Sequence, residues 1–486
     1  MKNYILLLMV LSLGLSSCSD EWMGDVLPTD NELAGEAFKS VKDGRNAVNG
    51  VFSLMQHQEY YGADHIVYGD LKAIDVQSKR IGARDDQMYL YRETTEASAT
   101  GMWTRPYKCL VSVNNALENL DQMVAKGEDE VLRKAEIEAN FYALRGLIHF
   151  DLLKIYSRIP AAVEGDVAKQ LGVVYANRII DKSEKPTREN LQESYDLVIN
   201  DLNKAIELMP DFEKMEKKSA TEGWFSLNAT KALLARVYLF NGQNQKAYDL
   251  AKEVIDSNAY ALVPYGQYKA SWTSAFNNSE AILTLINTDE DNTSREGVGN
   301  LWHPKGYNTM VFTNSFLNEI NSNPKDDRIN AIYKNEIKKK EVVVSVEYIS
   351  LKYPEQYAYK ARLIRLSEMY FIAAEAIYKV NNANAAEAAG LINEVLAERL
   401  DESDVLDASD INIERIVLEK RKEFVGEGMT FFDLMRNRMD VVRTGEGHLA
   451  GAPEEVKHND FRTIQPIPRL ELNVNTEIQQ NPDYAI

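Results

Sequence analysis

Cysteine is almost missing from this chain of 486 residues, whose only two cysteines are Cys18 and Cys109. An internal disulfide is not expected, because Cys18 stands at a predicted processing site and leaves Cys109 without a partner. Cys109 lies in an apolar helical stretch, where we expect a small buried hydrophobe. A hydrophobic content of 45% and a charged content of 27% predict a folded chain whose stability rests on a large core.

Recognisable catalytic motifs are also missing. The sequence has no His-Glu-x-x-His, Cys-x-x-Cys or Gly-x-Ser-x-Gly pattern, and its six histidines are scattered. Residues 289–292 are similar to the start of a calcium loop but lack its glycine and its distal glutamate. We therefore expect no catalytic residue, no metal site and no cofactor. A glycosidase carboxylate pair stays open at this point, because its two members need not be close in sequence.

Positive charge is in short supply. The chain has 55 lysines and arginines against 74 aspartates and glutamates, which gives a formal net charge of −19. Such a protein repels a phosphate backbone, so no nucleic-acid partner is expected. For the same reason an anionic polysaccharide is a less natural ligand than a neutral one.

The apolar run near the N-terminus is too short to span a membrane. Residues 4–15 form a stretch of about a dozen apolar residues behind Lys2, whereas a spanning helix needs roughly 20. This pattern predicts a removable export signal over residues 1–17. Leu15-Ser16-Ser17-Cys18 is similar to the bacterial lipobox, in which the cysteine is acylated, and this predicts a palmitate-bearing Cys18. The alternative is an ordinary signal peptide with a coincidental cysteine.

The segment that follows Cys18 has the composition of a tether. Ser19-Asp20-Glu21 is similar to the acidic tag that sends lipoproteins to the cell surface in one group of Gram-negative bacteria. Pro28, Thr29 and Asp30 favour turns. We expect a lipidated tether over residues 18–32, a single domain over residues 33–486, and an outer-membrane location facing the cell exterior.

Helical periodicity dominates the rest of the sequence. Apolar residues recur every three to four positions in several segments, and prolines such as Pro160 and Pro210 follow two of them. The predicted helices cover residues 103–124, 130–156, 187–208, 228–241, 243–256, 363–380 and 383–399.

Two of these helices are close to a tetratricopeptide pair. Leu234, Ala235, Tyr238, Ala247 and Ala251 fall near the tetratricopeptide spacing, with a glycine corner at position 242. Such pairs bury their faces by stacking on neighbours. The fold class predicted is therefore mainly α, with tetratricopeptide-like helices over about 103–256 and 361–436. A generic pair of antiparallel helices is the alternative.

The sequence between the helix pairs differs in composition and periodicity. Residues 56–100, 260–360 and 437–486 lack a helical period and are rich in Tyr, Gly, Asn and Pro. Short β-like runs occur at 281–286 and 342–346. We expect long loops and a few short strands packed on the helical body. Loops on a rigid scaffold often carry binding residues, so 56–100 and 260–360 are the predicted binding loops.

Five ordered segments resemble the SusD/RagB family of surface nutrient-binding lipoproteins. They are Trp103-x3-Tyr107 with Asn114; the stretch from Ala139 to Pro160 with Arg145 and Tyr156; Ile199, Asp201 and Leu202; Arg365 to Tyr370 with Ala374-Glu375-Ala376; and Glu419 to Gly428 with Phe432 to Arg436. The closing elements Pro466-Ile467-Pro468 and Asn481-Pro482 also match. The family usually has a glycine where Ser157-Arg158 stands here, and an arginine near Met429 and Thr430.

The last of these segments is dense in charge. Its charged members are expected to pair around the bend at residues 426–428 and to join two helices; they are Arg421, Glu423, Glu427, Asp433 and Arg436. An acid–base catalytic pair is the alternative. Arginines beside each carboxylate would lower its pKa, which favours an ion pair over a general acid.

Exposed aromatics in the loops are the candidates for ligand binding. Carbohydrate sites use aromatic faces against the C–H faces of sugars, with polar side chains around the hydroxyls. Aromatics that merely pack the loops onto the body are the alternative. The candidates, in order of preference, are Trp302 with Tyr307, then Trp272, Tyr60, Tyr61 and Tyr89.

The resemblance implies a non-catalytic lid on a transporter. It would bind oligosaccharide or polysaccharide and deliver it to a SusC-like TonB-dependent outer-membrane transporter. The RagB branch implies the same role with peptide cargo. A tetratricopeptide scaffold for a protein partner and a hydrolase are the other readings of the sequence.

Overall fold

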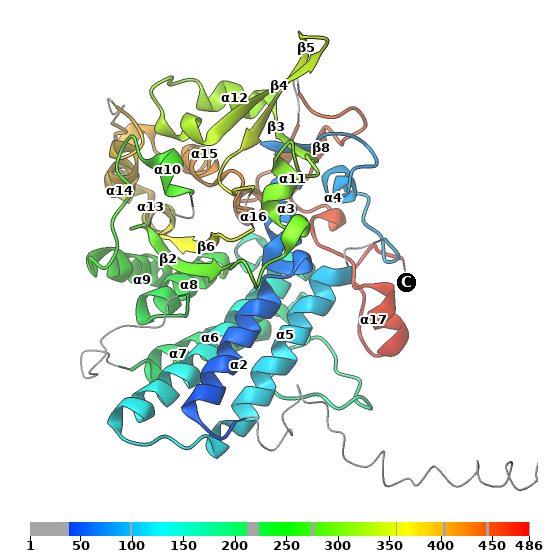
Figure 1. The fold of residues 1–486 in the computed structure, drawn as a ribbon, viewed down its shortest axis with the longest axis vertical. Coiled ribbons are helices and arrows are strands. Elements are labelled where there is room, and N and C mark those ends of the chain that lie inside the picture. Colours follow the sequence, from blue (N-terminus) through cyan, green and yellow to red (C-terminus); the bar gives the residue numbers. More distant parts are fainter. Residues whose placement is uncertain are drawn as a thin grey trace, which may run out of the picture.

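The computed structural model describes residues 38–97, 100–210, 223–273, 278–355, 357–401, 405–443 and 447–485. Figure 1 shows a mainly helical body with a few short strands at one end. The predicted signal, Cys18 and the tether lie outside the described residues.

The α-helices of the described residues are α2 (Val41–Met55), α3 (Asp64–Leu71), α4 (Asp86–Leu90), α5 (Thr100–Asn119), α6 (Glu128–Tyr156), α7 (Leu191–Leu208), α8 (Leu227–Phe240), α9 (Asn244–Asp256), α10 (Tyr268–Ser271), α11 (Val298–Trp302), α12 (Asn314–Ile320), α13 (Leu366–Val380), α14 (Ala385–Ala397), α15 (Ile413–Phe424), α16 (Thr430–Arg436) and α17 (Arg469–Val474). The strands are β1 (Val76–Ser78), β2 (Ala281–Ile286), β3 (Met310–Phe312), β4 (Ile332–Lys339), β5 (Val342–Ser350), β6 (Lys360–Arg365), β7 (Val441–Val442) and β8 (Glu455–Val456).

The long helices pack in a continuous series. Helix α2 lies against α5, and the contacts then run from α5 to α6, α7, α8, α9, α13 and α14 in that order (Figure 1). Each helix buries one face on its predecessor and another on its successor, as in helical repeat proteins. The predicted mainly α class is confirmed.

In the α8–α9 pair, the residues at the tetratricopeptide positions are buried. Leu234, Ala235, Tyr238, Ala247 and Ala251 are all buried. Small alanines let the two helices approach closely. The corner is made by a glycine at position 242 with a φ of 73°, a conformation that other residues adopt at a cost.

Helix α6 is tied to α7 by a buried ion pair. Arg145 donates from Nη2 to Asp201 Oδ1 at 2.6 Å, and the Tyr175 hydroxyl donates to Asp201 Oδ2 at 2.6 Å. Two positions of the family-like segments therefore meet across the helix interface.

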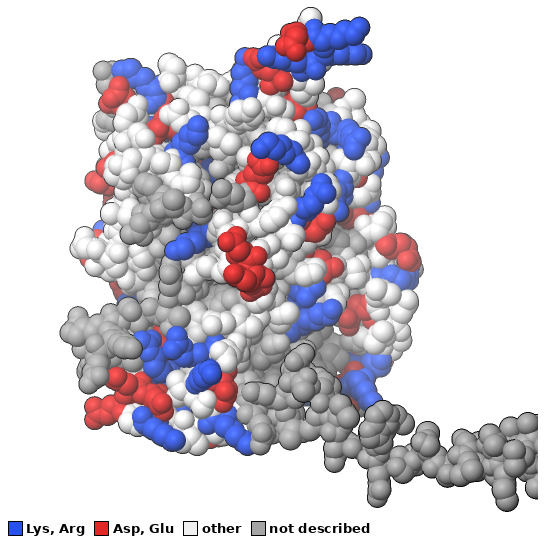
Figure 2. Space-filling view, viewed as in Figure 1, with Lys and Arg blue, Asp and Glu red and all other residues white. Residues whose placement is uncertain are grey.

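The strands form four separate two-stranded antiparallel sheets, β1–β3, β2–β6, β4–β5 and β7–β8. The β2–β6 pair joins residues 281–286 to the entry of α13, because β6 ends at Arg365 and α13 begins at Leu366. The β4–β5 hairpin projects from the body, and Figure 2 shows Lys and Arg side chains gathered on it.

Several helices were not expected from the sequence. Helix α2 precedes the predicted set, and the regions predicted to be loops contain α3 and the shorter helices α4, α10, α11, α12 and α17. All residues of α3 from His65 to Leu71 are buried. A helix buried on every side needs no polar face, so it shows no amphipathic period.

Helix α3 touches the charged bend at residues 426–428 through glycine. A Cβ placed on Gly69 would lie well inside van der Waals contact of the Gly428 carbonyl oxygen. Gly428 itself has a φ of 74°, and its own Cβ would collide with the Ile66 carbonyl. The two backbones can approach this closely only because neither residue has a side chain.

Gly69→Ala is expected to destabilise the protein by about 1–3 kcal/mol, because the added methyl group overpacks a backbone contact. Gly50→Ala is the matched control. Gly50 lies in α2 with open space around it, so alanine there should stabilise by up to about 1 kcal/mol. Chemical denaturation of both variants measures the difference; equal effects would contradict the close approach.

Candidate ligand-binding site

Most of the predicted aromatic platform is buried. Trp302 has no exposed surface and packs its ring on Phe312 with centroids 5.0 Å apart. Trp272 is 7% exposed and lies under Arg362, whose guanidinium carbon is 3.9 Å from the ring centroid. The expectation that these two tryptophans stand exposed is wrong. Long loops need apolar surface of their own to pack on the body, and large aromatic rings supply it.

The predicted tyrosines at 60, 61 and 89 are buried too. The Tyr60 and Tyr61 hydroxyls donate to Asp151 Oδ2 at 2.6 and 2.8 Å. The Tyr89 hydroxyl is 2.9 Å from His448 Nδ1. Each hydroxyl has an internal partner, so these rings pack loops onto the helices and present no platform to solvent.

Tyr307 differs from the other five candidates in lying at the surface. It is 36% exposed, and its hydroxyl donates to Glu296 Oε1 at 2.7 Å. The Arg84 guanidinium stacks on the ring, 4.3 Å from its centroid, and also pairs with Glu296. The hydrogen bond from Arg84 lowers the pKa of Glu296. The ring is therefore held in a fixed orientation with one face covered.

Glu296 also lines an open cleft of about 430 Å³. The cleft is therefore next to Tyr307, which is hydrogen-bonded to Glu296. We call it the polar cleft; its lining is Ser53, Leu54, Gln56, His57, Gln58, Arg105, Asp291, Asn292, Thr293, Ser294 and Glu296. One wall is the end of α2 and the residues after it, and the other is the 291–296 segment before α11. The two predicted binding-loop regions thus meet here. Ser53 Oγ, at the end of α2, donates to Asp291 Oδ1 at 3.0 Å across the cleft.

The polar cleft holds one unpaired acceptor and one unpaired donor. Gln56 is 5% exposed; its amide nitrogen donates to the Ile286 carbonyl at 2.7 Å, but its Oε1 has no partner among the described residues. Arg105 pairs with Glu59 at 3.3 Å, while its buried Nε likewise finds no partner there. Buried polar groups are normally paired, so these two atoms point to a ligand or water that both donates and accepts. No sequence pattern singles out either residue, since neither belongs to a motif.

The charged bend lies apart from the polar cleft, in the interior. Glu423 is fully buried and contacts Arg365 at 2.6 Å, Arg399 at 3.0 Å and Arg328 at 3.5 Å. Burial by itself would raise the pKa of Glu423, but these three arginines outweigh it and hold that pKa well below its ordinary value. Glu423 therefore stays ionised and has no proton to give.

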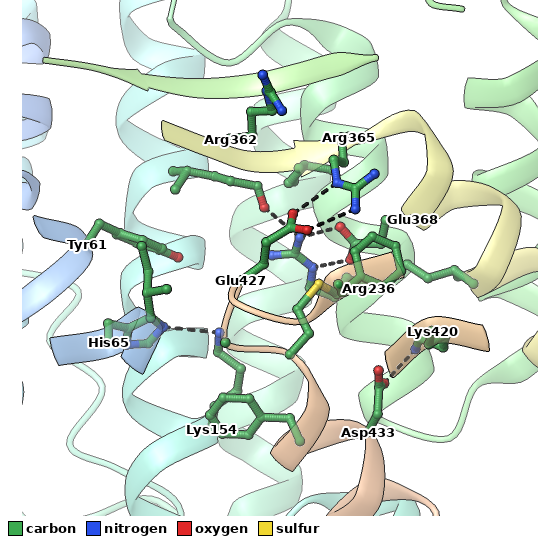
Figure 3. Close-up of a pocket in the computed structure, with 18 of the residues that line it drawn as sticks. Tyr61, His65, Lys154, Arg236, Arg362, Arg365, Glu368, Lys420, Glu427 and Asp433 are labelled. Carbon is green, nitrogen blue, oxygen red and sulfur yellow. Dashed lines mark hydrogen bonds and ion pairs between the residues drawn. The ribbon is translucent and has the colours of Figure 1, made fainter. Parts of the chain in front are cut away.

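Glu427 is held in the same way by neighbours from other elements. Arg365 donates to both of its carboxylate oxygens at 2.9 Å (Figure 3), and Lys352 contacts Glu427 at 2.7 Å. These two cations outweigh burial and lower the pKa of Glu427. Figure 3 shows Glu427 and Arg365 pointing toward each other in the lining of a small pocket, with Arg236 paired to Glu368 beside them.

The partners of the charged bend correct the sequence expectation. Within the predicted set, Asp433 and Arg436 pair with each other at 2.5 Å. Arg421 instead reaches Asp75, at 2.5 Å, and Arg436 also pairs with Glu375 of α13. The segment is thus an interior hub that ties distant elements together, and the joint extends well beyond its two helices.

Asp70 of α3 fastens the bend itself. Its two carboxylate oxygens accept the backbone N–H groups of Gly426 and Gly428, each at 3.1 Å. Burial raises the pKa of Asp70 to about 8, although both N–H groups act in the opposite direction. The described residues contain no group of three or more His, Cys, Asp or Glu arranged to hold a metal.

Comparison with known proteins identifies the family. A model of the SusD family matches residues 185–484, and a second model, described as starch-binding and associating with the outer membrane, matches residues 54–239. The chain belongs to the SusD family. No functionally curated protein matched it. Across the parts that the structure describes, no helix combines the length and the apolar character needed to cross a membrane.

Solved SusD-like structures share the fold over nearly the whole chain. A SusD superfamily protein from Bacteroides vulgatus is 30% identical, with 92% of this chain and 100% of that chain covered and a TM-score of 0.84. A candidate sugar-binding protein from the same organism is 27% identical, with 92% and 100% covered and a TM-score of 0.81. A laminarin-binding SusD-like protein is 21% identical, with 92% and 100% covered and a TM-score of 0.70, and shows the shared fold.

Glu423→Gln is expected to destabilise this SusD-family fold by about 3–5 kcal/mol, because it leaves buried arginines without their counter-charge. Glu207→Gln is the matched control: Glu207 is exposed and contacts Lys204 at 3.2 Å, so the change should cost no more than about 1 kcal/mol. Urea denaturation compares the two. A loss below about 1 kcal/mol for Glu423→Gln would show that the hub is not needed.

Asp70 makes stability depend on pH. Its folded pKa of about 8 exceeds the roughly 3.9 of an unfolded aspartate, so the fold binds the proton more tightly. The contribution is fully present below about pH 4 and is lost as the pH rises through 8, with a slope of up to about 1.4 kcal/mol per pH unit. Denaturation of wild type and Asp70→Asn between pH 4 and 9 should give curves that lie closest at low pH, where both side chains are neutral. The curves should separate as the pH rises, because only the wild-type side chain becomes a buried charge and loses stability. Parallel curves would contradict a raised pKa.

Proposed function

We propose that the protein is a non-catalytic cell-surface lipoprotein that binds oligosaccharide or polysaccharide and passes it to a SusC-like TonB-dependent outer-membrane transporter. The observation that carries the proposal is the polar cleft beside Tyr307. It offers side-chain amides, hydroxyls, carboxylates and a guanidinium within one open space of about 430 Å³.

The chemistry of the polar cleft suits a sugar. Each sugar hydroxyl both donates and accepts, so the hydroxyls of an oligosaccharide suit the amide, hydroxyl, carboxylate and guanidinium groups of the lining. The exposed part of the Tyr307 ring suits the C–H face of a sugar ring, and the guanidinium groups of Arg84 and Arg295 lie 4.3 and 5.7 Å from its centroid. Glycan binding is therefore assigned to Tyr307 and the polar cleft in place of the five buried aromatics.

Family membership supports the same cargo. One matching family model is described as starch-binding and outer-membrane-associated, and one structural relative is described as laminarin-binding. A hydrolase is disfavoured by the cleft itself, because Arg84 keeps Glu296 ionised and so removes it as a general acid.

A lipid anchor at Cys18 is compatible with an accessible cleft. The described fold is entered near the start of α2, and the polar cleft lies at the other end of that helix, about 22 Å away for 15 residues. The residues after α2 that line the cleft are thus about one helix length from the start of α2, which lies close to residue 38, the first described residue.

Affinity gel electrophoresis of residues 19–486 against a panel of neutral and anionic polysaccharides, with a peptide digest as competitor, tests the proposal. Retardation by one neutral glycan class is expected. Binding of peptide without binding of any glycan would indicate that the cargo is peptide. Co-purification with an outer-membrane barrel protein would support the transporter partnership, and a lone monomer in membrane extracts would count against it.

Tyr307→Ala is expected to weaken glycan binding at least about tenfold while changing stability by less than about 1 kcal/mol, because the ring is partly exposed. Tyr333→Ala is the control. Tyr333 is 47% exposed on β4 and does not line the polar cleft, so its loss should leave affinity unchanged. Calorimetric titration with the retained glycan measures both. Equal affinity of the two variants would remove Tyr307 from the site.

A further inference from the structure

A second cavity lies at the end of α6, away from the polar cleft. It measures about 170 Å³ and is walled by the last turn of α6, by α16 and by the segment around residues 458–464. It shares no lining residue with the polar cleft. We call it the apolar cavity. The proposed function does not use it, although part of its lining comes from two of the family-like segments, Ala139 to Pro160 and Phe432 to Arg436.

The walls of the apolar cavity are mainly hydrocarbon. Ile159, Phe431, Phe432, Met435 and Ile464 line it, and all five are buried in the fold. Protein interiors are normally close-packed, with few voids larger than a water molecule. A cavity of about 150 Å³ with such walls stays dry and takes up benzene, so this one has the size and surface for a single small ring.

One polar atom of the cavity lining has no partner. Ser157 follows α6 as its C-cap residue, and its backbone N–H is already bonded to the Leu153 carbonyl. The residue is 1% exposed, yet its Oγ finds no hydrogen-bond partner among the described residues. A buried hydroxyl without a partner carries a desolvation cost, and a ligand hydroxyl can remove it.

Two cationic side chains near Ser157 are already engaged. Arg158 donates to the Asp460 carbonyl at 3.0 Å and to Thr463 Oγ1 at 2.6 Å. Lys154 is paired with Asp151 at 2.9 Å. The polar side chains of Glu164, Gln170 and Asn459 also line the cavity. The Ser157 hydroxyl differs from them in being buried without a partner among the described residues, so it is the group that gains most from a ligand hydroxyl.

We propose that the apolar cavity binds a small, mostly apolar ring compound with one hydroxyl group, of the size of phenol. The ring lies among Phe431, Phe432 and Met435, and its hydroxyl exchanges a hydrogen bond with Ser157.

Calorimetric titration and thermal unfolding of residues 19–486 with phenol, and separately with benzene, test the proposal; the omitted residues lie outside the described fold. Saturable phenol binding with a rise in Tm is expected, with benzene about fivefold weaker for want of the hydrogen bond. Ser157→Ala should bring the two affinities together without loss of stability, since it removes an unpaired buried hydroxyl. An unchanged preference for phenol in that variant would overturn the role of Ser157.

Ala162→Phe fills the apolar cavity from its wall and should abolish binding of both compounds. Ala168→Phe is the matched control, because Ala168 is exposed and does not line the cavity. It should bind phenol as wild type does. Absence of saturable phenol binding to wild type, or undiminished binding to a folded Ala162→Phe, would overturn the proposal.

Discussion

Glu423 is an ionised carboxylate without exposed surface. The tertiary structure brings three arginines to it, and these balance its charge. Arg365 comes from the end of β6, Arg399 follows α14, and Arg328 lies in the 3-10 helix Asp327–Ala331. Three elements far apart in sequence must therefore reach one point. Buried ion pairs are weak evidence for net stability, but removing one member leaves a charge that the interior cannot tolerate. The hub thus acts chiefly by fixing where these three elements lie relative to one another.

The same hub fixes the helices that carry the rest of the molecule. Asp70 and the glycine contact hold α3 against the bend, and Tyr60 and Tyr61, just before α3, are anchored on Asp151 of α6. The residues at the end of α2 are thereby held at one wall of the polar cleft. A binding surface made of loops becomes rigid when each loop has buried attachments of this kind.

The polar cleft and the apolar cavity differ in the chemistry of their linings. The polar cleft is wide, lined by hydrogen-bonding side chains and flanked by a partly exposed ring, which suits a molecule with many hydroxyls. The apolar cavity is small and lined by hydrocarbon with one unpaired hydroxyl, at Ser157. In each lining, different polar atoms lack a hydrogen-bond partner among the described residues. A ligand that binds there should supply partners for those atoms.

The sequence by itself determined the helical class, the α8–α9 corner and the family resemblance, because these depend on local spacing and on contiguous motifs. It missed α3, whose burial on all sides removes any periodic signal. It also misplaced Trp302, since the composition of a loop does not show whether the body will cover it. Gln56 and Arg105 become neighbours of one cleft only when α2, α5 and the 291–296 segment are packed together. That juxtaposition depends on long-range contacts, which only the tertiary structure decides.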